Sequence, residues 1–170
     1  MAKQTRDAEF TEYVTSRSGW LRKVAYLLCG DWHRADDLVQ ETVTKLYVHW
    51  AKASRATNLD GYTRRMLVNT FLAEQRTPWW RRTVRTGVEP EVATANLDLE
   101  GSLDLRRALA ELPPRQRAAV VLRYYCDLSI DQAAEALGCS SGNVKSQSSR
   151  GLEALRNNLV ARPAVAGRTS

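Results

Sequence analysis

Apolar residues recur every three to four positions through the first half of the chain, which is the spacing of amphipathic helices. The pattern predicts a first helix over 7–28, which Gly30 interrupts, and a second helix from about residue 34 to residue 50. A polar loop follows, and Asn58 is placed to cap a third helix over about 59–76. The first half is therefore predicted to consist of three helices.

The second half continues the helical pattern with clear start and stop signals. A short amphipathic helix over 103–112 ends before Pro113 and Pro114, and Pro114 suits the first turn of the next helix. Further along, Ser129 and Gln132 have the spacing of a capping box, which marks another helix start. The predicted fold class is all-α.

A helix-turn-helix is predicted after the capping box. Ala134 stands where two helices would cross, Gly138 stands in the turn, and Val144 is an apolar anchor on the second helix. Ser148 falls on the inward side of this second helix, where an apolar residue is expected.

The outward face of the second helix gathers side chains that can read bases: Asn143, Ser146 and Arg150, flanked by Gln147 and Ser149. Arginine can contact guanine with two hydrogen bonds, and asparagine or glutamine can contact adenine in the same way. Lys145 and Arg156 lie off this face and are better placed for phosphates. A plain charged surface is the alternative interpretation of Arg150.

The helix over 34–50 separates its side chains into an apolar arc and an opposite arc of acidic and polar groups: Asp36, Asp37, Gln40, Glu41 and Thr44. This face has three interpretations. It is a solvated helix face, a docking face for a partner with basic or amide groups, or a metal or acid/base site. The last interpretation uses the one-turn spacing of Asp37 and Glu41, with His33 before them.

The helix over 59–76 aligns four side chains on one side: Tyr62, Arg65, Asn69 and Arg76. Guanidinium, amide and aromatic groups in a row suit single-stranded nucleic acid, although an ordinary basic surface has the same pattern. The following Trp79 and Trp80 either close a small core or lie against a polyanion.

Composition and charge indicate a globular protein that binds an anionic partner. The chain has 170 residues, 44% hydrophobic and 26% charged, which is the balance of a globular protein. Its net charge of +6 divides into +6 over 1–85, −4 over 86–102 and +4 over 103–170. The basic excess favours an anionic partner. The acidic middle segment is predicted to be an extended linker between two basic helical units, and a long surface loop within a single domain is the alternative interpretation.

The sequence also argues against several classes. No apolar run approaches the roughly 20 residues of a membrane span, and the N-terminus lacks a signal-peptide core. Cys29, Cys126 and Cys139 are too far apart to indicate a disulfide framework or a cysteine zinc site. We therefore expect a cytoplasmic protein with no cofactor and no membrane partner.

Three segments resemble the short, two-domain extracytoplasmic-function (ECF) sigma factors of bacterial RNA polymerase, in the sigma-70 family. They are ADDLVQETV (35–43), GYTRRMLVNTFLAEQR (61–76) and the run from ALAELPPRQR to SRGLEALR (108–156). The tandem tryptophan is most similar to an actinobacterial branch. The resemblance implies two small helical domains, a region 2-like domain over 1–85 and a region 4-like helix-turn-helix domain over 103–160. The resemblance does not cover the acidic segment over 86–102, predicted to be a flexible linker, or the small-residue tail over 161–170, predicted to be disordered.

The resemblance also implies a role for each candidate residue. The face that binds the β′ clamp helices of core polymerase would contain Asp36, Asp37, Gln40 and Glu41. The −10 element would be bound by Tyr62, Arg65, Asn69 and Arg76. The −35 element would be bound by Asn143, Lys145, Ser146, Gln147, Ser149 and Arg150. Further implied partners are the β subunit, promoter DNA and an anti-sigma factor, which in many members wedges between the domains. No catalytic residue or metal ligand is implied, so no enzyme is expected.

Departures from the family pattern occur at Ala73, where an aspartate is usual, and at Asn143, where a threonine is usual. We therefore expect an altered −35 preference.

The alternative function is a stand-alone helix-turn-helix regulator that binds duplex DNA without polymerase. The enzymatic alternative is a metal-dependent hydrolase built on His33, Asp36, Asp37 and Glu41.

Overall fold

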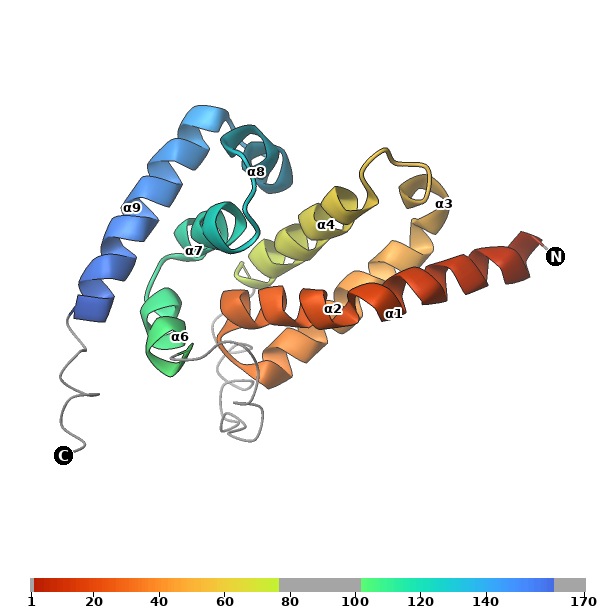
Figure 1. Ribbon diagram of the computed structural model, residues 1–170, viewed down its shortest axis with the longest axis horizontal. Coiled ribbons are helices and arrows are strands. Elements are labelled where there is room, and N and C mark those ends of the chain that lie inside the picture. The colour runs from red at the N-terminus through yellow and green to blue at the C-terminus, as the bar shows by residue number, and fades with distance from the viewer. Residues whose placement is uncertain (1, 77–101, 161–170) are drawn as a thin grey trace.

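The computed structural model describes residues 2–76 and 102–160, and every regular element in these ranges is helical (Figure 1). The predicted all-α class is confirmed. The predicted linker over 86–102, except for Ser102, lies outside the described residues, as do Trp79, Trp80 and the predicted tail over 161–170. None of the described helices is both long and apolar enough to cross a membrane.

The N-terminal helices are α1 (Ala2–Cys29), α2 (Trp32–Val48), α3 (Trp50–Ala53) and α4 (Leu59–Glu74). Gly30 permits the turn between α1 and α2, because its φ of 77° lies in the left-handed region that side chains with a Cβ avoid. Asp31 then caps α2 by accepting a hydrogen bond from the His33 backbone nitrogen at 2.8 Å. Asn58 caps α4, as predicted.

The end of the second helix differs from the prediction. The helix stops at Val48, and Trp50 begins the separate turn α3, so the first part of the predicted polar loop is helical. Trp50 is 3% exposed, and its ring centroid lies 5.3 Å from that of Phe10. Because Trp50 follows the buried Leu46 by one helical turn, the apolar face of α2 continues into α3 across the break.

The C-terminal helices are α6 (Ser102–Ala110), α7 (Pro114–Val120), the π-helical turn η2 (Val121–Tyr125), α8 (Ile130–Leu137) and α9 (Ser141–Val160). The capping box of Ser129 and Gln132 starts α8. Gly138, with a φ of 68°, ends α8 and directs the chain into α9. Helices α8 and α9 form the predicted helix-turn-helix.

The inward side of the helix-turn-helix is also as predicted. Ala134 is buried at 7% exposure and Val144 is fully buried. Ser148 is buried as well, and its hydroxyl donates a hydrogen bond to the Val144 carbonyl at 2.7 Å. Its own helix therefore satisfies the one polar group on this side.

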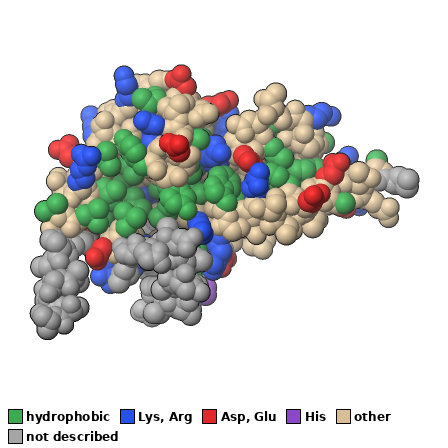
Figure 2. All heavy atoms as spheres, viewed as in Figure 1, with side chains coloured by type: hydrophobic (Ala, Val, Ile, Leu, Met, Phe, Trp, Pro, Cys, Tyr) green, Lys and Arg blue, Asp and Glu red, His purple; other side chains and the backbone are tan. Residues whose placement is uncertain are grey.

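A single hydrophobic cluster joins the two halves of the chain. Its buried members come from α1, α2 and α4 and from all the C-terminal helices, and Leu28, Phe71 and Leu122 are fully buried within it. Hydrophobic side chains also form a band from the C-terminal helices on the left of Figure 2 into the middle of the molecule. The two halves are thus packed against each other.

Candidate nucleic-acid interface

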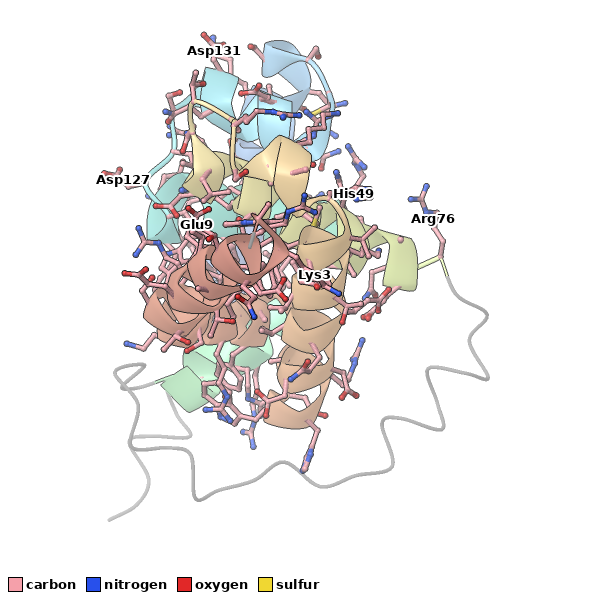
Figure 3. The ribbon with its side chains drawn as sticks, turned by 90° about the vertical axis from the view of Figure 1, so that its right-hand side faces the viewer. Lys3, Glu9, His49, Arg76, Asp127 and Asp131 are labelled. Atoms are coloured by element: carbon pink, nitrogen blue, oxygen red, sulfur yellow. The ribbon has the colours of Figure 1, made fainter. Side chains whose placement is uncertain are left out.

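The outer side of α4 forms one wall of a hollow of about 390 Å³. Three of the four predicted strand-binding residues, Tyr62, Arg65 and Asn69, line this hollow. The rest of the lining is Met66 and Thr70 of α4, Lys45 of α2 and Lys52 of α3. Arg76, the fourth predicted residue, is absent from the lining, and it lies past the end of α4 and points away from the molecule (Figure 3).

Two lysines that the sequence pattern did not single out complete the hollow. Lys45 Nζ donates a hydrogen bond to Thr70 Oγ1 at 3.2 Å and lies 3.5 Å from the Glu41 carboxylate. Lys52 stands on α3, in the segment predicted to be a loop. In the sequence, the only feature that marks both residues is that they are positively charged and flank Trp50. Their place in the hollow could be inferred only after Trp50 was known to be buried beside α4.

The chemistry of the lining suits a single nucleic-acid strand. Lys45, Lys52 and Arg65 supply positive charge for phosphates. The Tyr62 ring offers a surface on which a base can stack, and the Asn69 amide offers both a donor and an acceptor for a base edge.

A small second core supports the hollow from behind. Its buried residues are Leu46, Trp50 and Ala53, and Phe10, Tyr13 and Val14 of α1 pack against them with Leu59, Tyr62 and Met66 of α4. Tyr62 and Met66 therefore belong both to this core and to the lining. The N-terminal part of α1 thus helps to hold these two side chains of the lining in place.

A hydrogen-bond network centred on Asp60 ties the start of α4 to α1. Asp60 accepts hydrogen bonds from the Tyr13 hydroxyl at 2.8 Å and from Arg17 Nε at 2.8 Å and Nη2 at 3.1 Å. The hydrogen bonds from Arg17 hold the pKa of Asp60 below its usual value. Burial raises the pKa of Tyr13 to about 12. Asp60 is thus ionised at neutral pH, and its bonds orient the first turn of α4.

Replacing Asp60 by asparagine should lower the free energy of unfolding at pH 7 by less than about 1 kcal/mol, because both partners are partly exposed. The pKa of Asp60 is lowered by folding, so the carboxylate stabilises the fold above the ordinary aspartate pKa of about 3.9. The difference between wild type and Asp60→Asn should therefore begin to shrink below that value and should be lost as the pH falls through the lower pKa of Asp60 in the folded protein. Urea denaturation at pH 7, 5 and 3.5 measures it.

The control for this prediction is Asp37→Asn. Asp37 is exposed and forms no ion pair among the described residues, so its replacement should change the free energy of unfolding at pH 7 by less than about 0.5 kcal/mol. A deficit in Asp60→Asn of equal size at pH 7 and pH 3.5 would contradict the assigned role of the carboxylate charge.

The acidic face of α2 comprises Asp36, Asp37, Gln40 and Glu41, all of them exposed. The Asp36 carboxylate lies 2.7 Å from Arg22 Nε, and the Arg22 guanidinium lies 4.3 Å from the Trp32 ring centroid. Among residues 2–76 and 102–160, no three His, Cys, Asp or Glu side chains are grouped so that they could hold a metal ion. The face is open to a macromolecular partner.

The outward face of α9 presents the side chains that were predicted to read bases. Those of Asn143, Lys145, Ser146, Ser149 and Arg150 are exposed, and Gln147 is half-buried. The first turn of α9 is held in place by the Asn143 backbone nitrogen, which donates to Ser140 Oγ at 3.1 Å, and by Ser141 Oγ, which donates to Asp131 of α8 at 2.7 Å. A fixed helix with a free polar face is what major-groove binding requires.

Comparisons with known proteins match the two segments of the chain that contain these candidate surfaces. The family model "Sigma-70 region 2" matches residues 13–81, which include the α2 face and the hollow, and "Sigma-70, region 4" matches residues 102–155, which include the helix-turn-helix. The sequence is similar to the RNA polymerase sigma-E factor of Streptomyces coelicolor, with 37% identity over 163 residues that cover 91% of this chain and 88% of the relative. It is also similar to the ECF RNA polymerase sigma factor SigW of Bacillus subtilis, with 26% identity covering 92% and 91% of the two chains.

A solved structure agrees with these relatives. The sigma factor RpoE from Bartonella quintana, in complex with the anti-sigma factor NepR, has a TM-score of 0.70 and 28% identity. The match covers 89% of this chain and 96% of that chain. The chain therefore belongs to the sigma-70 family, as an RNA polymerase sigma factor of the ECF type. Sigma factors are non-catalytic proteins that recognise promoters in transcription initiation.

Proposed function

We propose that this sigma factor divides promoter recognition between its two halves, residues 1–85 and 103–160. The first half docks on core RNA polymerase and binds the −10 element, and the second half binds the −35 element. The observation that supports this most is that each half exposes one polar face suited to nucleic acid. Those faces, the hollow of α4 and the outer side of α9, lie within the matched regions 2 and 4.

The acidic face of α2 is the proposed contact with the β′ clamp helices of the polymerase. Its side chains are not equivalent, because Asp36 is already bound to Arg22 and Glu41 lies near Lys45. Asp37 and Gln40 are exposed on the same face. They are therefore the side chains most available to a basic or amide group on the polymerase.

The hollow of α4 is the proposed holding site for unpaired bases of the −10 element. Opening of the duplex costs stacking energy of about 1.4 kcal/mol per base-pair step. Stacking of a captured base on an aromatic side chain such as Tyr62 contributes about 1–3 kcal/mol. The free energy gained from a few captured bases, together with phosphate contacts from Lys45, Lys52 and Arg65, is therefore comparable with the free energy needed to open the duplex locally. Arg76 would act farther along the strand, since it lies outside the hollow.

We further propose that the protein is not an enzyme, that it acts in the cytoplasm with the polymerase, and that an anti-sigma factor regulates it. The anti-sigma proposal is supported by the similar RpoE structure, which was solved as such a complex.

The decisive experiment is transcription in vitro with purified core polymerase on a promoter library. Discrete start sites that require this chain, together with co-purification of the chain with the β′ subunit, are the expected result. Absence of both would contradict the proposal. Tight binding of the chain alone to duplex DNA, without initiation, would instead support a stand-alone regulator.

Replacing Arg150 by alanine should weaken −35 selection without loss of polymerase binding. A bidentate contact with a base discriminates by about 1–3 kcal/mol, so initiation at promoters with the preferred −35 sequence should fall about ten-fold or more. The matched control is Arg156→Ala, since Arg156 is exposed on the same helix but off the reading face. That variant should reduce initiation evenly across sequences. Equal loss of polymerase binding in Arg150→Ala would contradict the assignment.

A further inference from the structure

A second hollow, of about 540 Å³, lies between the start of α1 and the turn α3. Its polar lining consists of Thr5, Arg6 and Glu9 of α1, with Ser54 and Arg55 at the end of α3. The rest of the described lining is one alanine from each of these helices. Both helices lie at the end of the molecule away from α9 (Figure 1), and none of the described lining residues comes from the C-terminal helices.

Arg6 and Arg55 give this hollow a positive charge. Both side chains are exposed, and neither forms an ion pair or a side-chain hydrogen bond within residues 2–76 and 102–160. Glu9 is the one carboxylate in the described lining, so two guanidinium groups face a single negative charge. The hollow therefore has a net positive charge and two cationic groups with no anionic partner of their own.

The chemistry of this lining suits phosphate groups better than bases. The described lining contains no aromatic ring and no side-chain amide, so it lacks the groups with which Tyr62 and Asn69 are suited to hold a base. Guanidinium groups bind phosphate oxygens with paired, charge-assisted hydrogen bonds. Such contacts position a nucleic acid without reading its sequence.

Helix α3 connects the two hollows. Lys52 lines the hollow of α4, whereas Ser54 and Arg55 line the second hollow. The turn is anchored between them, because Trp50 is buried in the small core. A helix with its side chains is about 10–12 Å across, so a single strand can pass over α3 within a few nucleotides. Positive charge accompanies it from one hollow to the other.

We propose that the hollow between α1 and α3 is a second strand site, at which Arg6 and Arg55 bind phosphates of the single strand whose bases occupy the hollow of α4. This inference rests on the proposed function, because the path over α3 begins in the hollow of α4. That continuity of charge favours nucleic acid over an acidic protein as the occupant. Glu9 weakens the site, since its carboxylate repels phosphates.

The test compares two double variants of the full-length chain, each assembled with core polymerase. Arg6→Ala/Arg55→Ala removes both guanidinium groups from the second hollow. The matched control is Arg107→Ala/Arg115→Ala, which removes two exposed arginines of α6 and α7 that line neither hollow. Since all four side chains are exposed, both variants should keep the helical circular-dichroism signal of wild type. The probes are fluorescein-labelled twelve-nucleotide single strands, one of mixed sequence and one of thymidine only, measured by anisotropy with core polymerase alone as the blank.

Arg6→Ala/Arg55→Ala should bind both strands about 25-fold more weakly than wild type at a salt concentration of about 0.1 M. Each lost phosphate contact lowers the affinity for a single strand about five-fold at this concentration, and it lowers the slope of log affinity against log salt by about 0.7. The slope should therefore fall by about 1.4. The control should bind as wild type does, and Glu9→Gln should bind more tightly.

Three results would overturn the second strand site. The first is an affinity of Arg6→Ala/Arg55→Ala no lower than that of the control. The second is a loss confined to one of the two strands, which would indicate contact with bases. The third is unchanged strand affinity with weaker binding to polymerase, which would assign the hollow to an acidic protein surface.

Lys52→Ala separates these outcomes from failure of the proposed function. This change removes a cation from the hollow of α4 and leaves the second hollow intact, so it should weaken binding of both strands about five-fold. Weaker binding by Lys52→Ala, with wild-type affinity in Arg6→Ala/Arg55→Ala, overturns the second site alone. Wild-type affinity in Lys52→Ala, or absence of initiation by the wild type in transcription with core polymerase, overturns the proposed function itself.

Discussion

Replacing Phe71 by alanine is expected to destabilise the whole molecule by about 3–5 kcal/mol. Phe71 is fully buried in the cluster that both halves share, and its ring lies beneath the Arg117 guanidinium. The change removes a large apolar side chain and leaves a cavity at the contact between α4 and the C-terminal helices. Both halves should therefore lose stability together.

The distribution of tryptophan makes this prediction measurable. All five tryptophans lie between positions 20 and 80, so their fluorescence reports on the first half, whereas circular dichroism reports on the helices of both halves. In urea, the two signals should change together in wild type and should shift together in Phe71→Ala. Val48→Ala is the control, since Val48 is 72% exposed and its replacement should change stability by less than about 0.5 kcal/mol. A fluorescence transition that shifts while a separate helical transition stays in place would refute a shared core.

Replacing Gly151 by valine should cost about 3 kcal/mol and should displace α9 from α7. A Cβ at position 151 would lie 2.6 Å from Val120 Cγ2 and 3.1 Å from the Gln116 carbonyl oxygen. The second contact is with backbone, which does not move aside as a side-chain end does, so α9 must shift. Since α9 carries Arg150 and the rest of the reading face, −35 selection should be lost together with stability.

Gly142 supplies the matched control in the same helix. A Cβ at this position has no neighbour within 4 Å, and alanine is a better helix former than glycine. Gly142→Ala should therefore raise the unfolding midpoint, with a gain of up to about 1 kcal/mol. Thermal and urea denaturation of the two variants should give shifts of opposite sign. A Gly151→Val variant as stable as wild type would show that α7 and α9 do not pack as closely as described.

Helix caps and helix breaks that can be recognised in the sequence were sufficient to predict most of the helices. The caps at Asn58 and Ser129 and the break at Gly30 act within a few residues of their own positions, and these three predicted boundaries have their counterparts in the structure. The first helix begins at Ala2, earlier than the predicted start at residue 7. Trp50 is a further exception. The amphipathic pattern continues through it, but the helix ends two residues earlier, at Val48. The aromatic partner of Trp50, Phe10, lies 40 positions away in the chain, so this contact could not be predicted from local pattern.

The candidate site was predictable where its residues share a helix. Tyr62, Arg65 and Asn69 follow helical spacing on α4, so their common face could be found from periodicity, and the same holds for the outward face of α9. Lys45 and Lys52 could not be found in this way, because they come from α2 and α3. Their place beside α4 depends on the small core around Trp50.

Periodicity, capping and motif spacing thus established an all-α chain, its helix-turn-helix and the polar faces of α2, α4 and α9. These features depend on residues within one or two helical turns, so they leave a regular trace along the chain. Packing alone established that the two halves share one core and that the Arg106 and Arg117 side chains donate hydrogen bonds to the Gly30 and Leu28 carbonyls at the end of α1. Those hydrogen bonds join residues 76 and 89 positions apart, and contacts over such separations have no periodic pattern from which they could be inferred.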